Sequence, residues 1–263
     1  MLLTQFALTI IIVGFVTAGL RIRFDRFFAI LLLLFLFGFG IKTSINVFLW
    51  VIALGALTII LQNKTKIYQL PKQKKIKLFL ISPIFALFAS LIGSVLFEYT
   101  TSNVLIITLG ILAILYGARL VFIHFQKHEL EYVKANPIIS KICGLAGPWI
   151  SGFFIGFVGT SFKSLKIPFA IKIGKMNAKQ VYLGNTITAF FASLFAIIWH
   201  YILNQTNTVF YENMLLGLAT FAGIHFVYEL TEIVFPDKWR KSFQILIGII
   251  LIFVSAKIFM LIN

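Results

Sequence analysis

Two clusters of basic and hydroxyl-bearing residues each lie beside a short apolar run of the sequence. The first cluster contains Arg21, Arg23 and Arg26, and the second contains Thr160, Ser161, Lys163, Ser164 and Lys166. Arginine and lysine supply full positive charges, and hydroxyl groups donate hydrogen bonds to a sulfonate or a carboxylate. The unpaired N–H groups at the start of a short helix add about half a positive charge. These residues are therefore candidates for binding a small anionic substrate; alternatively, they reach lipid headgroups and only anchor the loops.

One histidine and two glutamates share a face of the apolar segment 211–234. His225, Glu229 and Glu232 are spaced i, i+4 and i+7, so one side of a helix presents all three. Ionisable groups inside a bilayer cost about 2.5 kcal/mol or more unless they are paired or hydrated. The pattern indicates a proton-coupling relay in which His225 lies deepest. The alternative is that the two glutamates pair with Lys238 or Arg240 near the end of the segment.

Two asparagines occupy comparable places in the two halves of the chain. Asn46 and Asn185 both lie early in a long apolar segment. Each could supply a polar contact to the substrate near the middle of the membrane. Hydrogen bonding between helices is the alternative explanation.

Neither metal chemistry nor an enzyme activity is indicated. His124 and His128 have the spacing of two metal ligands next to Glu129, but a solvated loop accounts for them. Cys143 is the single cysteine, so one chain cannot form a disulfide or a thiolate cluster, and we expect a small buried thiol. The zinc motif HExxH, the nucleophile elbow GxSxG and a P-loop are missing from the sequence. We therefore expect no metal site, no cofactor and no catalytic residue.

The elements that must position these residues are membrane segments. Hydrophobic residues make up 60% of the 263 positions, charged residues make up 12%, and the mean hydropathy is +1.00. These values lie well outside the range that is typical of soluble domains. The formal net charge is +15, and the basic residues lie in short loops between apolar runs. This placement indicates that they orient the protein in a membrane, and it argues against nucleic-acid binding.

Apolar runs predict an all-α polytopic bundle of about 8–10 membrane segments. The ten runs cover residues 2–20, 27–40, 43–61, 78–97, 102–123, 141–159, 165–175, 179–203, 211–234 and 242–262. The runs 27–40 and 165–175 are short and are interrupted by glycine, proline or lysine. We interpret them as broken or re-entrant helices.

The charges of the loops predict the orientation of the chain. The connection between the third and fourth runs contains six lysines, including Lys74, and the loops near Glu98 and Glu212 contain no Lys or Arg. By the positive-inside rule the lysine-rich loops are cytoplasmic, Lys74 has an orienting role, and both termini are outside. Lys163 and Lys166 then fall on the outward side if every segment crosses, an exception that suggests a functional role.

Weak internal similarity predicts two inverted repeats. Gly14 and Phe24 recur 138 positions later as Gly152 and Phe162, and each half contains one long, one short and three long runs. An odd number of segments makes two copies antiparallel, as in many secondary transporters with a substrate site at the midplane. The expected division is residues 1–124 as the first repeat, 125–140 as a cytoplasmic linker and 141–263 as the second repeat. Chance similarity among apolar helices is the alternative.

The second half resembles the TauE/SafE sulfite exporter family. The likeness is carried by Gly156, Gly159 and Pro168, and by the stretch from Asn177 to Thr188 that begins the next helix. Where the family usually has a glycine triplet, this chain has Ser161, Phe162 and Lys163. The resemblance implies a transporter fold and a small organic or sulfur-containing anion, such as sulfite or a sulfonate, as substrate.

Together these features predict a multi-pass plasma-membrane protein that exports an anion by secondary transport, with proton coupling as one option. An anion channel or passive facilitator needs the same basic pore without the relay, so it stays open as the alternative. An intramembrane enzyme is the weaker rival. The expected partners are the lipid bilayer and a small anionic substrate, and a homo-oligomer is left open.

Overall fold

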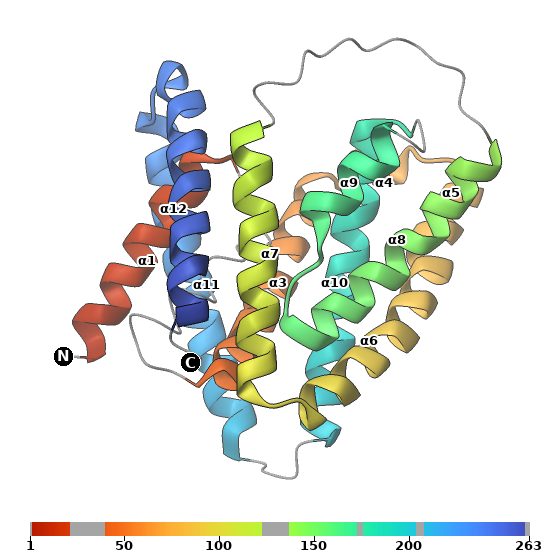
Figure 1. Cartoon of the computed structure of the whole chain (residues 1–263). Helices are drawn as coiled ribbons and strands as arrows, with labels where there is room; N and C mark the ends of the chain where they lie inside the picture. The colour runs from red at the N-terminus through yellow and green to blue at the C-terminus, as the bar shows by residue number, and fades with distance from the viewer. Residues whose placement is uncertain (1, 22–39, 123–136, 173–175, 204–207, 261–263) are drawn as a thin grey trace.

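The computed structural model describes residues 2–21, 40–122, 137–172, 176–203 and 208–260, and every regular element within these ranges is a helix (Figure 1). The first half contains α1 (Leu2–Gly19), α3 (Ile41–Gln62), α4 (Lys64–Tyr68), α5 (Lys72–Ile76), the π-helix η1 (Lys77–Ile81), α6 (Ser82–Tyr99) and α7 (Ser102–Phe122). The second half contains α8 (Pro137–Val158), α9 (Lys163–Lys172), α10 (Ala178–Leu203), α11 (Thr208–Val234), the 3₁₀-helix η2 (Asp237–Trp239) and α12 (Arg240–Met260). Arg23, Arg26, His124, His128 and most of the short run 27–40 lie outside the described residues.

Six helical stretches within the described residues are long and apolar enough to cross a membrane. They are Ile41–Gln62, Lys72–Tyr99, Ser102–Phe122, Ala178–Leu203, Phe210–Val234 and Asp237–Ala256. Two shorter apolar stretches, Phe6–Gly19 and Ile142–Val158, belong to α1 and α8. The expected all-α bundle of membrane segments is confirmed.

The helices run in two opposite directions, as Figure 1 shows. Helices α1, α3, α7 and α11 run toward the end of the bundle that carries α4 and α5, and α6, α8, α10 and α12 run away from it. We call this the basic end, because α4 and α5 carry Lys64, Lys66, Lys72, Lys74 and Lys75. The opposite end carries the connection between α6 and α7, which has no basic residue. The positive-inside rule predicts that the basic end is cytoplasmic.

Helix α10 lies at the centre of one group of helices and packs against α3, α6 and α8. Helix α8 also packs along α6, while α1 packs against α11 and α7 packs against α12. The buried face of α10 is built from small and polar residues such as Thr188, Ala192 and Ala196, which allow close approach of its neighbours.

The α7–α12 contact depends on two glycines that face each other. A Cβ atom added at Gly117 would lie 2.6 Å from the backbone oxygen of Gly248, and one added at Gly248 would lie 2.7 Å from the backbone oxygen of Gly117. Both distances are shorter than a van der Waals contact. Only glycine at both positions lets the two helix backbones touch without a shift.

Helices α8 and α9 form a hairpin that turns back inside the bundle. Helix α8 begins at the basic end, and Lys166 of α9 contacts Gly147 and Ser151 of α8, so the two helices run side by side in opposite directions. The turn uses two residues with left-handed backbone conformation, Gly159 (φ 70°) and Phe162 (φ 52°). The interpretation of the run 165–175 as part of a broken helix is confirmed, although the helix begins earlier, at Lys163.

Candidate functional site

A cavity of about 260 Å³ lies at the basic end between the α5–η1–α6 helix, the α8–α9 hairpin and the start of α10. Three lysines line it, Lys74, Lys77 and Lys166, and its described lining contains no aspartate or glutamate. Lys74 on the rim is exposed to solvent, and Asn185 on the wall is buried. Most of the remaining lining is apolar or glycine. The cavity therefore combines a net positive charge with an apolar wall.

Lys166 is held in place by the hairpin. Its Nζ atom donates hydrogen bonds to the Gly147 backbone oxygen at 3.3 Å and to Ser151 Oγ. The buried Ser151 hydroxyl in turn donates to the backbone oxygen of Ser161 at 3.3 Å. A half-buried ammonium group is thus fixed in the cavity wall by oxygen atoms of α8.

The other two lysines come from the helix that begins at the basic end. Lys74 Nζ donates to Gln180 Oε1 at 3.3 Å, across to the first turn of α10. Lys77 lies against α8, where a Cβ atom at Gly144 would come within 2.8 Å of its Nζ atom. Lys77 is also the first residue of the π-helical turn η1, which precedes Pro83 in the first turn of α6. Such turns relieve the missing N–H of a nearby proline and are frequent at functional sites.

Asn185 brings an unpaired amide to the cavity wall. The residue is 5% exposed, and neither Oδ1 nor Nδ2 has a hydrogen-bond partner among the described residues. An unpaired buried amide costs about 1–3 kcal/mol. A group of this kind in a cavity wall points to a ligand or a second conformation that satisfies it.

The structure brings some of the sequence-derived candidates together. Lys166 and Asn185 line the same cavity, and Thr160 and Ser161 are buried in the adjoining hairpin turn. Lys163 is half-buried at the start of α9, and Ser164 follows it in the same helix. The expectation that Lys166 lies on the side opposite to Lys74 is wrong, because α9 doubles back along α8 and does not continue across the bundle.

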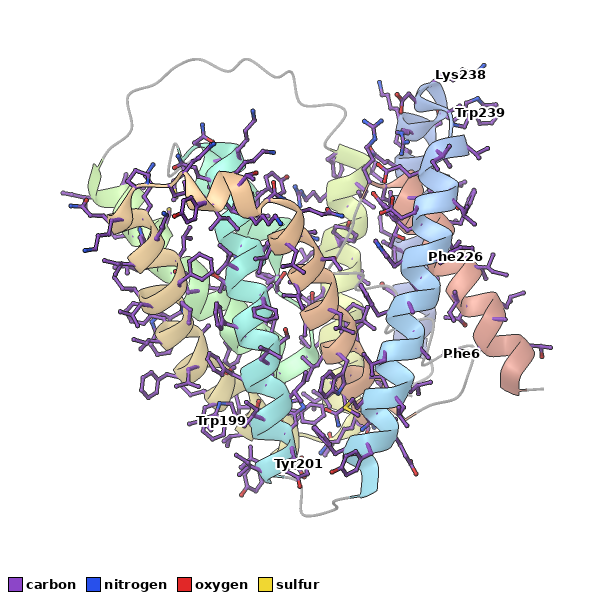
Figure 2. All side chains as sticks on the ribbon, turned by 180° about the vertical axis from the view of Figure 1, so that it is seen from behind. Phe6, Trp199, Tyr201, Phe226, Lys238 and Trp239 are labelled. Atoms are coloured by element: carbon purple, nitrogen blue, oxygen red, sulfur yellow. The ribbon has the colours of Figure 1, made fainter. Side chains whose placement is uncertain are left out.

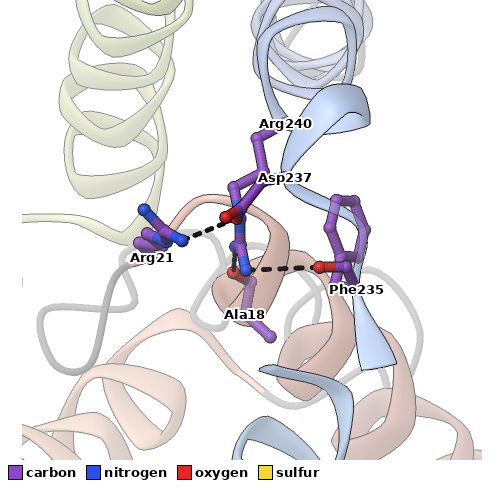
Figure 3. Close-up of polar contacts among 5 residues, drawn as sticks. All are labelled: Ala18, Arg21, Phe235, Asp237 and Arg240. Carbon is purple, nitrogen blue, oxygen red and sulfur yellow. Dashed lines mark hydrogen bonds and ion pairs between the residues drawn. The ribbon is translucent and has the colours of Figure 1, made fainter. Parts of the chain in front are cut away.

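Arg21 lies apart from this cavity. Its guanidinium pairs with Asp237 at 2.6 Å, and Asp237 also accepts a bond from Arg240 Nε at 2.6 Å (Figure 3). Arg240 is 8% exposed and donates to the Ala18 backbone oxygen at 2.8 Å, so it joins the end of α1 to the start of α12. Arg21, a candidate for binding the anion, is therefore not part of the cavity lining, and its helix α1 packs mainly against α11.

The predicted relay residues lie on α11, away from the cavity lining. His225 Nδ1 is 3.9 Å from Glu229 Oε1, with side chains 36% and 47% exposed, and the imidazole stacks on Phe221. Glu232 lies one turn further on in the same helix, and Arg240 pairs with Asp237 and not with Glu229. His225 is therefore at the surface of the bundle rather than in its interior.

A buried histidine that sequence reasoning missed lies near the end of α10. His200 is 5% exposed; its Nδ1 atom is 2.6 Å from Asn46 Oδ1 and its Nε2 atom is 2.7 Å from the Gly156 oxygen. Asn46 is therefore hydrogen-bonded to another helix, which was the alternative to a contact with the substrate. One signal could have revealed His200: it continues the spacing of Ala192 and Ala196 on the buried face of α10.

Comparison with known families gives one match. A family model described as Sulfite exporter TauE/SafE matches residues 27–258, nearly the whole chain. Searches of curated proteins and of solved structures found no match. The family match confirms the resemblance carried by Gly156, Gly159 and Pro168. Phe162, which stands where that resemblance expects glycine, has the positive φ that favours glycine. With the six candidate spans, the match places the chain among multi-pass cell-membrane transporters.

Proposed function

Because the chain belongs to the sulfite exporter TauE/SafE family, we propose that it is a secondary transporter of a small organic or sulfur-containing anion, which binds in the cavity at the basic end. The observation that carries the proposal is the charge of the cavity: three lysines and no carboxylate in the described lining. A cavity with one sign of charge and low-dielectric walls concentrates ions of the opposite sign.

The size and lining of the cavity support a proposal for the class of substrate. A volume of about 260 Å³ exceeds what a bare sulfite ion fills, given that one water molecule occupies about 30 Å³. Leu70, Leu78 and Pro148 add apolar surface beside the lysines. We propose an organic anion whose sulfonate or carboxylate group contacts Lys166 while its carbon portion lies against these residues.

We further propose that residues 1–124 and 141–263 form two inverted repeats. In support, α1 packs on α11 as α8 packs on α6, and α3 packs on α11 as α10 packs on α6. The pairs α3–α10 and α7–α12 each join equivalent helices, and the partners in each pair run in opposite directions (Figure 1). Helix α8 begins at Pro137, slightly before the expected boundary.

Details at equivalent positions support the same proposal. Gly14 faces Val227 of α11, and Gly152, 138 positions later, faces Ala86 of α6. Arg21 follows the end of α1 with φ 53°, and Gly159, again 138 positions later, follows the end of α8 with φ 70°. Inverted repeats would allow alternating access, in which the cavity at the basic end closes as an equivalent one opens at the opposite end.

The experiment is an uptake assay in proteoliposomes with sulfite, short alkyl sulfonates and small carboxylates, with and without an imposed proton gradient. A transporter coupled to protons accumulates its anion against a concentration gradient, whereas a channel or passive facilitator only equilibrates it. Proton coupling through His225, Glu229 and Glu232 predicts that His225→Ala abolishes the gradient-driven accumulation and leaves membrane insertion intact. Failure of every tested anion to enter above protein-free liposomes would contradict the transporter proposal.

A further inference from the structure

At the opposite end of the bundle, one side chain joins four helices. His200 of α10 bonds to Asn46 of α3 and to the Gly156 oxygen of α8, and its ring stacks on Phe97 of α6 with centroids 4.1 Å apart. Figure 2 shows its neighbours Trp199 and Tyr201 at this end of α10, far from Lys238 and Trp239 at the basic end. These contacts connect α3, α6, α8 and α10 at the end away from the cavity.

The two bonds of the imidazole depend on its proton state. The Gly156 oxygen accepts only, and the Thr160 N–H that would normally bond to it reaches Phe154 instead, so Nε2 of His200 carries a hydrogen. A neutral ring then leaves Nδ1 as an acceptor, which Asn46 satisfies by turning its NH₂ group toward it. A protonated ring instead donates from Nδ1, so Asn46 must then present its Oδ1 atom to the ring.

The charged groups around the imidazole determine whether its neutral or its protonated form is more stable in this cluster. From α3, Lys42 Nζ lies 5.3 Å from the Phe97 ring centroid and donates to the Glu98 backbone oxygen at 2.7 Å. From α6, Glu98 contributes the backbone oxygen that accepts from Lys42, and from α8 the Gly156 backbone oxygen bonds to the ring. A proton added to the buried ring would meet the nearby Lys42 ammonium, and the ion pairs of the described residues include no carboxylate partner for it. The charged ring is therefore better accommodated where water reaches it.

The two ends of the bundle differ in the hydrogen bonding of their buried asparagines. Asn46 of α3 is bonded to His200 at the opposite end, while Asn185 of α10 has no hydrogen-bond partner among the described residues beside the cavity at the basic end. We propose that His200 is a proton-binding latch, which holds the opposite end closed when neutral and releases it when protonated. Its role in transport rests on the proposed function, whereas the latch itself can be tested without any substrate.

The test measures access of a reagent to the helix face behind the latch. Ala196, one turn before His200 and fully buried, is replaced by cysteine in a Cys143→Ser background of the full-length protein. A membrane-impermeant maleimide is applied to vesicles from the side that labels Thr101→Cys, an exposed position at the opposite end. The ratio of the Ala196→Cys rate to the Thr101→Cys rate cancels the effect of pH on thiol reactivity.

With His200 present, the ratio should rise about tenfold between pH 8 and pH 6, since one linked proton allows up to about tenfold per pH unit. In His200→Gln, whose amide can bond to both partners but takes up no proton, the ratio should not change with pH. Ser193→Cys provides a second reporter if Ala196→Cys does not fold. A flat ratio with His200 present, or an equal rise in His200→Gln, overturns the latch.

Anion flux in the same vesicles separates the two proposals. A pH-dependent ratio without flux of any tested anion means that the latch stands and the proposed function fails. Flux with a flat ratio means that the transporter stands and the latch fails.

Discussion

Lys166 of α9 donates a hydrogen bond to Ser151 of α8, and the Ser151 hydroxyl donates a second hydrogen bond to the backbone oxygen of Ser161 at the hairpin turn. A charge in the cavity wall is thereby connected to the turn that contains the two left-handed residues Gly159 and Phe162. Any ligand that draws the ammonium group away from Ser151 also changes the hydrogen bonding of this turn. If the proposed function holds, anion binding at Lys166 would act on the backbone of the hairpin.

Loss of the charge at Lys166 should weaken anion binding. We expect Lys166→Gln to lower the affinity for the transported anion by about tenfold or more, because a hydrogen bond to a charged group contributes about 1.5–3 kcal/mol. Lys64→Gln is the matched control, since Lys64 is exposed at the basic end and does not line the cavity. Affinities are compared at fixed ionic strength, because screening alone could mimic the effect. Equal affinities in the two variants would place the binding site elsewhere.

Replacement of Asn185 should reduce transport without lowering thermal stability. Asn185→Leu removes an unpaired buried amide, so we expect unchanged or higher thermal stability together with at least about a tenfold loss of transport. Asn46→Leu, the counterpart in α3, should instead lower stability by about 1–3 kcal/mol, because it leaves His200 without a partner at Nδ1. Thermal unfolding in detergent and anion uptake are measured on both variants. Normal transport by Asn185→Leu would show that its amide does not contact the substrate.

The contact between α7 and α12 should tolerate no side chain at its centre. Gly117→Ala places a Cβ atom 2.6 Å from a backbone oxygen, and we expect a loss of about 1–3 kcal/mol, typical of overpacking. Gly40→Ala is the control, since the nearest atom to its added Cβ is Thr43 Oγ1 at 4.0 Å. Thermal unfolding should therefore distinguish the two alanine variants. Equal unfolding temperatures would mean that the two helices separate at little cost.

The ion-pair cluster at the end of α1 should depend on Arg240 far more than on Arg21. Arg21 and Asp237 are 56% and 75% exposed, and an exposed pair contributes about 0–1 kcal/mol. The buried Arg240 also donates to the Ala18 carbonyl, so Arg240→Ala leaves that carbonyl without its side-chain donor and removes one of the two partners of Asp237. We expect Arg240→Ala to lower the unfolding temperature clearly and Arg21→Ala to leave it nearly unchanged. The reverse order would contradict this assignment.

Much of the fold could be predicted from the sequence, because apolar runs of about 20 residues have few alternatives in a membrane. The helices α3, α7 and α10 begin and end close to their apolar runs. The short run after Gly159 was correctly expected to be broken, since Lys166 and Pro168 do not suit a crossing helix. Its direction was not predictable, because hydropathy says where a segment lies and not whether it crosses or turns back.

The site could be predicted only in part. Lys166 and Asn185 were found because polar residues stand out in apolar segments. Lys74 cannot be told from the other lysines of its loop by sequence, and only its contact with Gln180 of α10 places it at the cavity. His200 was missed because its partners, Asn46 and Gly156, lie more than 40 positions away in the sequence.

Cys143 allows the most direct test of the central claim, that the cavity at the basic end binds the transported anion. It is the single cysteine of the chain and lines this cavity, so no engineered residue is needed. The measurement is the rate of Cys143 alkylation by a neutral maleimide at fixed ionic strength, with increasing sulfite, alkyl sulfonate or carboxylate. We predict that the anion transported best slows the reaction at least about tenfold at saturation, and that this protection weakens in Lys166→Gln in proportion to the loss of affinity. An alkylation rate that no transported anion changes would contradict the claim that this cavity is the binding site.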